Sequence, residues 1–187
     1  MLLFTIGSTF LYFQQTAIID QTLADPKART SLLAWIDVTV NTLTLIVQLF
    51  LTGRLLRWCG VGVTLALLPF CSVIGFVSLG LAPLLAIVVI FQTVRRATNF
   101  AIAGPAREVL FTVLTREDKY KAKNLIDTFV YRSGDQLGAW ANGLLLGVFH
   151  LSISGVAFVA VPLSALWLLV ALWLGRRQKE LADETAL

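Results

Sequence analysis

Short polar segments divide the chain into six apolar stretches, each about as long as a bilayer is thick. A membrane-spanning helix needs roughly 20 mostly apolar residues. The stretches cover residues 1–19, 31–52, 61–80, 84–103, 125–149 and 153–175. At 57% hydrophobic and 14% charged residues, the chain is also too apolar for an ordinary soluble domain. The sequence therefore predicts an all-α integral membrane protein, a single bundle of six transmembrane helices with the lipid bilayer around it, and a tail at 176–187.

Lysine and arginine are distributed unevenly over the predicted loops. The second-to-third loop, the fourth-to-fifth loop and the tail contain Arg54, Arg57, Arg107, Arg116, Lys119, Lys121, Lys123, Arg176, Arg177 and Lys179. The opposite side has only Lys27 and Arg29. Because cationic loops resist translocation, we expect a multi-pass protein of the inner (plasma) membrane with both termini in the cytoplasm. No cation precedes the first stretch, so we also expect further sequence before Met1.

Polar residues inside four of the six stretches fall on one helical face. At 100° per residue, the fifth stretch, which contains IDTFVYRSGDQLGAW, gathers Asn124, Asp127, Tyr131, Gly134, Asp135, Gly138 and Asn142 on one arc, with Arg132 beside it. The fourth gathers Gln92, Arg95, Arg96 and Asn99; the second gathers Asp37, Asn41, Thr44 and Gln48; the first has Ser8, Tyr12 and Gln15. The third and sixth stretches lack such a face, so the pattern predicts a polar interior shared by helices one, two, four and five.

Six charged residues at membrane depth require partners, because each costs about 2.5–3.5 kcal/mol at the bilayer centre. Three carboxylates and three guanidiniums could balance one another. Arg132 and Asp135, three residues apart, could simply neutralise each other as a structural pair. The neighbours Arg95 and Arg96 repel each other unless an anion or a carboxylate answers both. They favour an anion site, the alternative being that both extend to the interface.

Two further patterns limit the function classes. Gly134 and Gly138 form a G-x-x-x-G spacing, which favours close helix packing over ligand binding. The chain contains no metal-ligand cluster, P-loop or nucleophile–base arrangement. The sequence therefore predicts a protein that is not an enzyme, with no cofactor, no metal and no nucleic-acid partner.

The distribution of polar faces resembles one half of a major facilitator transporter. In such a half, two three-helix repeats place the first, second, fourth and fifth helices around a cavity, and the third and sixth lie outside. The segment GRLLRWCG, residues 53–60, is similar to the G-x-L-x-x-R-x-G signature after the second helix of a half, without the usual acidic residue at Leu56. The resemblance implies an N-terminal six-helix half that is missing from this chain.

A second resemblance covers GPAREVLFTVLTREDKYKAKNLID, residues 104–127. It is similar to the late part of the ATP/ADP translocase family, with its Pro-x-Arg/Lys-Glu entry, Lys-x-Lys run and Ile-Asp opening the next helix. The matching positions are Pro105, Arg107, Glu108, Lys121, Lys123, Ile126 and Asp127. The resemblance implies a nucleotide exchanger. Where the family has Gly-Lys-Ser-Gly, this chain has SGDQ, so another anionic or zwitterionic substrate is the alternative.

These patterns lead to one functional hypothesis and two rivals. The hypothesis is a carrier of an anionic solute, most simply a nucleotide, working by alternating access. The substrate-binding residues would be Arg95, Arg96, Arg132, Asn99, Gln92 and Tyr131. The counter-charges that re-pair when the site empties would be Asp37, Asp127 and Asp135. The rivals are a proton-coupled permease with the carboxylates as proton carriers, and a membrane sensor or scaffold module without transport.

Overall fold

The computed structural model describes residues 1–113 and 116–185, and every regular element among them is a helix. In chain order they are α1 (Leu2–Thr22), α2 (Pro26–Val47), η1 (Gln48–Thr52), α3 (Gly53–Leu81), α4 (Leu85–Thr98), η2 (Asn99–Ala103), α5 (Gly104–Leu110), η3 (Phe111–Val113), α6 (Arg116–Leu125), η4 (Ile126–Val130), α7 (Tyr131–Gly147) and α8 (Ile153–Thr185). No strand occurs in these two ranges. The predicted all-helical class is confirmed.

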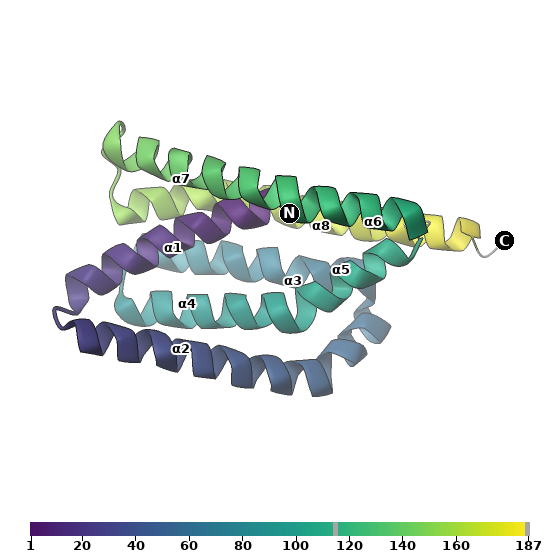
Figure 1. Ribbon diagram of the computed structural model, residues 1–187, viewed down its shortest axis with the longest axis horizontal. Coiled ribbons are helices and arrows are strands. Elements are labelled where there is room, and N and C mark those ends of the chain that lie inside the picture. The colour runs from purple at the N-terminus through teal and green to yellow at the C-terminus, as the bar shows by residue number, and fades with distance from the viewer. Residues whose placement is uncertain (114–115, 186–187) are drawn as a thin grey trace.

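Within the described residues, four helical runs are long and apolar enough to cross a membrane. They are Leu2–Thr22, Pro26–Leu81, Leu85–Leu110 and Ile153–Leu181. The 56-residue run contains two antiparallel helices, because α2 and α3 run in opposite directions in Figure 1. The helix from α6 through η4 to α7 crosses the same bundle but is not among the apolar runs. Charged and glycine residues lower the hydropathy of this helix, which corresponds to the fifth predicted span at 125–149.

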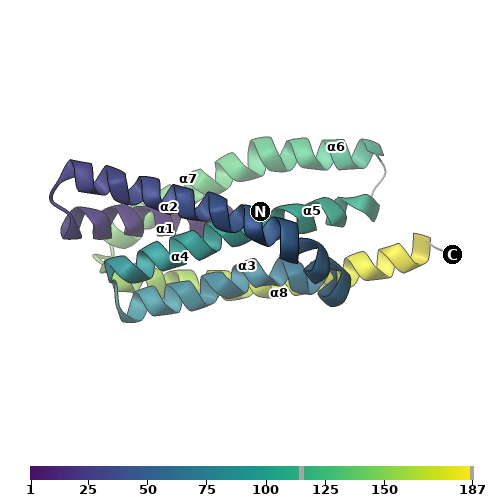
Figure 2. The same ribbon diagram turned by 90° about the horizontal axis from the view of Figure 1, so that it is seen from below.

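The predicted loop at 53–60 is wrong, because these residues are helical. The segment contains no proline, so every residue in it keeps the backbone N–H that a helix requires. The helix breaks only at Gly60, with φ 75° and ψ 172°, a conformation that glycine adopts without a steric penalty. Figures 1 and 2 show the chain turning between α2 and the part of α3 that returns along the bundle.

Two further segments outside the predicted spans are helical at the same end of the bundle. The connection at 104–124 forms a helical hairpin in which α5 continues from α4 through η2 and α6 leads into α7. The tail at 176–187 is helical as far as Thr185. Ion pairs one turn apart support both extensions, Glu117 with Lys121 at 2.6 Å and Arg177 with Glu180 at 2.8 Å.

The helices form two layers. Figures 1 and 2 show α7, α1, α4 and α2 in one layer, with α8 and α3 behind them. Helix α1 packs on α7, α8 and α4; α4 packs on α2, α3 and α1; and α3 packs on α8. The same contacts are obtained when α1 changes places with α4, α2 with α7 and α3 with α8. For example, the contact of α1 with α7 corresponds to the contact of α4 with α2. The bundle therefore consists of two three-helix units of opposite direction with equivalent packing.

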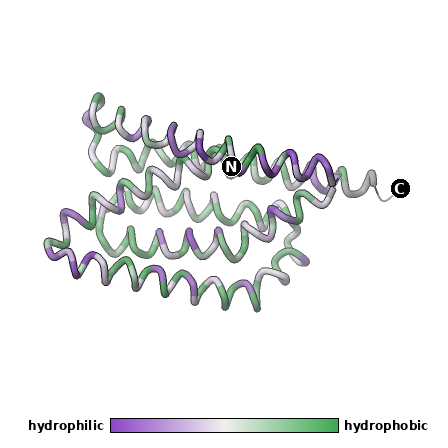
Figure 3. Tube along the Cα trace, in the orientation of Figure 1, coloured by the Kyte–Doolittle hydropathy of each residue, from purple (hydrophilic) through white to green (hydrophobic). Residues whose placement is uncertain are grey.

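The apolar core lies between the two layers. Its buried side chains come from α1, α3, α4 and α8: Phe10, Leu11, Ile18, Phe76, Leu79, Val88, Phe91, Val156, Ala157 and Ala160. Many large apolar side chains also lie on the outer surface, including Trp35, Leu49 and Trp140. Such broad apolar exposure suits contact with lipid rather than water. Figure 3 shows hydrophilic residues collecting in α6 and recurring along α7.

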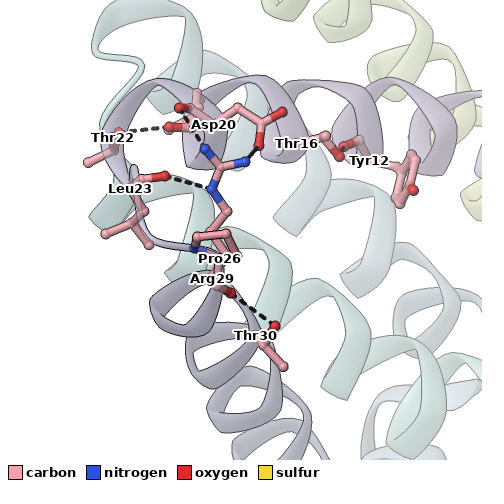
Figure 4. Close-up of polar contacts among 9 residues, drawn as sticks. Tyr12, Thr16, Asp20, Thr22, Leu23, Pro26, Arg29 and Thr30 are labelled. Atoms are coloured by element: carbon pink, nitrogen blue, oxygen red, sulfur yellow. Dashed lines mark hydrogen bonds and ion pairs between the residues drawn. The ribbon is translucent and has the colours of Figure 1, made fainter.

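Charged residues differ between the two ends of the bundle. The α1–α2 turn is closed by Arg29, which donates to the Leu23 carbonyl at 2.6 Å and to the Asp20 carbonyl at 3.2 Å, and pairs with the Asp20 carboxylate (Figure 4). Asp25 caps α2 by accepting from the Lys27 amide at 3.0 Å. The opposite end carries the cationic segments, namely the start of α3, α5, α6 and the end of α8. We name it the cation-rich end.

Candidate functional site

The layer of α7, α1, α4 and α2 carries the charged residues predicted for the polar interior. An ion pair joins α4 to the neighbouring helix α2: Arg96 Nη1 lies 2.5 Å from Asp37 Oδ1. The two side chains are 36% and 56% exposed, so the pair lies on an open surface and not in the core. Of the three carboxylates and three guanidiniums that the sequence could balance only in number, the structure pairs Arg96 with Asp37.

On the other side of this layer, α1 and α7 run parallel and in close contact. A Cβ built on Gly134 would lie 2.0 Å from Thr5 Oγ1, and one on Gly138 would lie 2.9 Å from Thr9 Cβ. The packing role predicted for the G-x-x-x-G spacing is confirmed. Thr9 Oγ1 donates to Asp135 Oδ1 at 3.4 Å, so the carboxylate sits beside this seam with its side chain exposed.

Arg95 has an environment unlike that of its neighbour. Its side chain is buried, with 4% exposure. The guanidinium donates to the Phe4 carbonyl at 3.1 Å, to Ser8 Oγ at 2.8 Å and to Ser72 Oγ at 3.3 Å. No described carboxylate lies within 4 Å of it. The structure therefore separates the two adjacent arginines, with Arg95 inside the bundle and Arg96 on the exposed side of the α7, α1, α4 and α2 layer. We name this side, which bears the Arg96–Asp37 pair, the polar face.

The remaining predicted residues divide between the polar face and the cation-rich end. Arg132 is exposed, and in the described part of the chain no ion pair joins it to Asp135, so the alternative of mutual neutralisation is not what the structure adopts. Asp127 is exposed near Lys123. Gln92 Oε1 is buried without a hydrogen-bond partner among the described residues.

Asn99 and Tyr131, both predicted to bind substrate, lie in a cluster with Phe4 and Arg107, two residues that were not predicted to bind substrate. Asn99 Oδ1 accepts from Arg107 at 3.3 Å, and Tyr131 packs edge-on against Phe4 with ring centroids 6.2 Å apart. The Phe4 ring is contacted by two guanidiniums, with Arg95 Cζ at 5.0 Å and Arg107 Cζ at 5.9 Å from its centroid. Each arginine thus gains a cation–π contact.

Arg107 is the residue that sequence reasoning placed in a loop and assigned no role in a site. The available signal was its position in the segment at 104–127, of whose quoted residues Arg107, Glu108, Lys123, Ile126 and Asp127 line one cavity. Lys123 Nζ lies 2.6 Å from Glu108 Oε1, and Lys119 Nζ lies 3.9 Å from Glu108 Oε2. The hydrogen bond to Glu108 raises the pKa of Lys123. These contacts tie α5 to α6.

The described residues contain no group of three or more His, Cys, Asp and Glu side chains that could hold a metal ion. No protein-family model, curated protein or solved structure matches the chain. The geometry of the polar face and of the cation-rich end is therefore the basis for the function proposed below.

Proposed function

We propose that this chain is the C-terminal six-helix half of a major-facilitator-like secondary carrier that moves an anionic solute by alternating access. The observation that carries the proposal is the open polar face with its Arg96–Asp37 pair. Charged side chains in a membrane cannot face lipid without a large cost, and they line cavities or meet partner helices. A second half facing this surface would enclose it as a substrate cavity.

The packing of the bundle supports the same proposal. Two three-helix units of opposite direction with equivalent contacts are the expected construction of such a half. The layer of α3 and α8 lies behind the polar face, as the outer helices of a half would. With the cation-rich end in the cytoplasm, both termini would be cytoplasmic and the carrier would lie in the plasma membrane.

The roles of the arginines follow from their different partners. Arg96 is paired with Asp37 on the open face, so a substrate anion can compete with the carboxylate for the guanidinium. Arg95 is held by neutral acceptors alone and keeps an unbalanced positive charge just behind that face. An anion near α4 would be attracted by both, although only Arg96 is placed to touch it in this conformation. The resemblance at 104–127 favours a nucleotide as that anion.

Uptake of radiolabelled ATP, ADP and inorganic phosphate tests the proposal in cells expressing the gene that encodes this chain. Saturable uptake of at least one of the three is expected. Arg96→Gln should lower it by about tenfold or more, since a charge-assisted hydrogen bond contributes about 1.5–3 kcal/mol. Arg54→Gln, an equal change of charge at an exposed position outside the polar face, is the matched control. Equal uptake by the two variants at equal membrane expression would refute the role of Arg96.

One observation favours proton coupling as a second candidate. Asp135 contacts the Thr9 hydroxyl at 3.4 Å, and no cation among the described residues forms an ion pair with it. A carrier of this kind would lose transport when the proton gradient is collapsed. An uptake rate unaffected by an uncoupler would exclude this candidate and leave exchange.

A further inference from the structure

Two cavities meet at the cation-rich end of the bundle. The larger, of about 400 Å³, is apolar, and α1, α3 and α8 contribute much of its wall through residues such as Leu3, Leu68 and Trp167. The smaller, of about 290 Å³, lies between α5, η4 and α7 and is lined by charged side chains. They share Met1, Arg107, Phe111 and Ile126. Cavities of this size accept small organic ligands or segments of lipid.

Arg107 stands where the two cavities join. Its guanidinium donates to Asn99 Oδ1 at 3.3 Å and to Met1 Sδ at 3.2 Å, and it lies over the Phe4 ring. No described carboxylate lies within 4 Å of it. A planar guanidinium with neutral partners retains the capacity to bind a phosphate group through two parallel hydrogen bonds.

The charged side chains that line this cavity are balanced in number, Arg107 and Lys123 against Glu108 and Asp127, and the nearby Lys119 adds one more cation. Glu108 forms an ion pair with Lys123 at 2.6 Å and a longer one with Lys119 at 3.9 Å. Asp127 lies near Lys123 and forms no ion pair within the described ranges. Counting Lys119, three cations therefore meet two carboxylates at this place. A ligand that suits both cavities has an apolar chain and a negatively charged head.

We propose that this double cavity binds one anionic phospholipid from the cytoplasmic leaflet, with an acyl chain in the apolar cavity and its phosphate on Arg107. Anionic lipids are concentrated at that surface, and basic pockets between membrane helices recognise their head groups. The phospholipid holds α1, α5 and α8 together at the end of the bundle where the α5–α6 hairpin begins. The choice of leaflet rests on the orientation proposed above, whereas the site itself does not depend on whether the protein transports a solute.

Thermal unfolding of the purified full-length protein in a neutral detergent tests the site. The probes are dioctanoyl phosphatidylglycerol, dioctanoyl phosphatidylcholine, octanoate and inorganic phosphate. A ligand that binds only the folded state raises the unfolding midpoint in a saturable way. We expect phosphatidylglycerol to act at concentrations about tenfold or more below those of phosphatidylcholine. Equal potency of the two lipids would mean ordinary lipid solvation and would overturn the proposal.

The other two probes separate the sources of the anionic group. An equal rise with inorganic phosphate alone would assign the charged cavity to soluble phosphate, and an equal rise with octanoate would assign the apolar cavity to fatty acids. Either result overturns a phospholipid site. None of these outcomes bears on uptake, so failure here is distinct from failure of the proposed transport.

Two variants address the two cavities separately. Arg107→Gln removes the charge but keeps a donor for Asn99, and it should weaken phosphatidylglycerol binding by about tenfold or more. Arg54→Gln is the control at the same end, outside both cavities. Ala171→Phe, which places a ring in the apolar cavity, should weaken binding with the arginine intact and provides the test if Arg107→Gln does not fold. Unchanged affinity in a folded Arg107→Gln or Ala171→Phe protein would overturn the assignment.

Discussion

Replacing Arg95 with methionine separates a structural role for this arginine from a functional one. The guanidinium is buried and binds three acceptors, the Phe4 carbonyl and the hydroxyls of Ser8 and Ser72. Each acceptor group retains a local hydrogen bond without it. Ser8 Oγ donates to the Phe4 carbonyl at 2.8 Å, and Ser72 Oγ donates to the Leu68 carbonyl at 3.0 Å. Methionine fills similar space and leaves no buried carboxylate without a partner.

The magnitude follows from this accounting of partners. Removing one member of a buried ion pair typically costs about 3–5 kcal/mol, because the other charge is stranded. Arg95 has no such partner, and burying an ion itself costs several kcal/mol, which offsets the hydrogen bonds that methionine loses. We therefore expect the free energy of unfolding to change by less than about 2 kcal/mol in either direction. For a chain of this size the midpoint should stay within about 6 °C of the wild type.

Thermal unfolding in detergent and solute uptake, measured on the same Arg95→Met protein, give the decisive comparison. Preserved stability with uptake reduced about tenfold or more indicates that the unbalanced charge serves the substrate. Arg95→Ala serves as a second variant, because the space it leaves should destabilise the bundle by about 2–5 kcal/mol. A loss of stability in Arg95→Met as large as that in Arg95→Ala, or full uptake, would refute this reasoning.

Three further predictions concern packing, pH and helix ends. Gly134→Ala should destabilise the bundle by about 1–3 kcal/mol through overpacking of the α1–α7 seam, whereas Gly143→Ala, where a Cβ meets nothing within 4 Å, should not; a chemical-denaturation comparison decides. The hydrogen bond that Lys123 donates to Glu108 raises the pKa of Lys123, so the contribution of Lys123 to stability is complete below the ordinary lysine pKa of about 10.4 and is lost as pH rises through the folded value. Between neutral and alkaline pH, spin labels on α5 and α6 should accordingly show a distance distribution that broadens only above about pH 10.4, and a distribution already broad at pH 7 would contradict this. Arg29→Gln should lower stability by about 0.5–2 kcal/mol by weakening the α1–α2 turn, and an unchanged unfolding midpoint would show that the turn does not need it.

The G-x-x-x-G face was predictable because it depends only on the 100° step of a helix. That step places Gly134 and Gly138 one turn apart on the same face, and the structure packs that face on α1. It also separates Arg95 and Arg96 by 100°, although the sequence does not say which neighbouring helix each one meets. Gly60 breaks the second helical run because it alone in GRLLRWCG takes a positive φ next to the change in direction.

The sequence by itself determined the helical class, the apolar runs and the charge asymmetry between the two ends, because these follow from the local order of residues. Only the tertiary structure decided that Arg95 is buried on neutral acceptors while Arg96 pairs with Asp37. It also decided that Arg107, distant in sequence from Phe4, stands at the junction of two cavities. Such contacts depend on how helices pack against one another, and helical periodicity gives the direction of each face but not the partner that covers it.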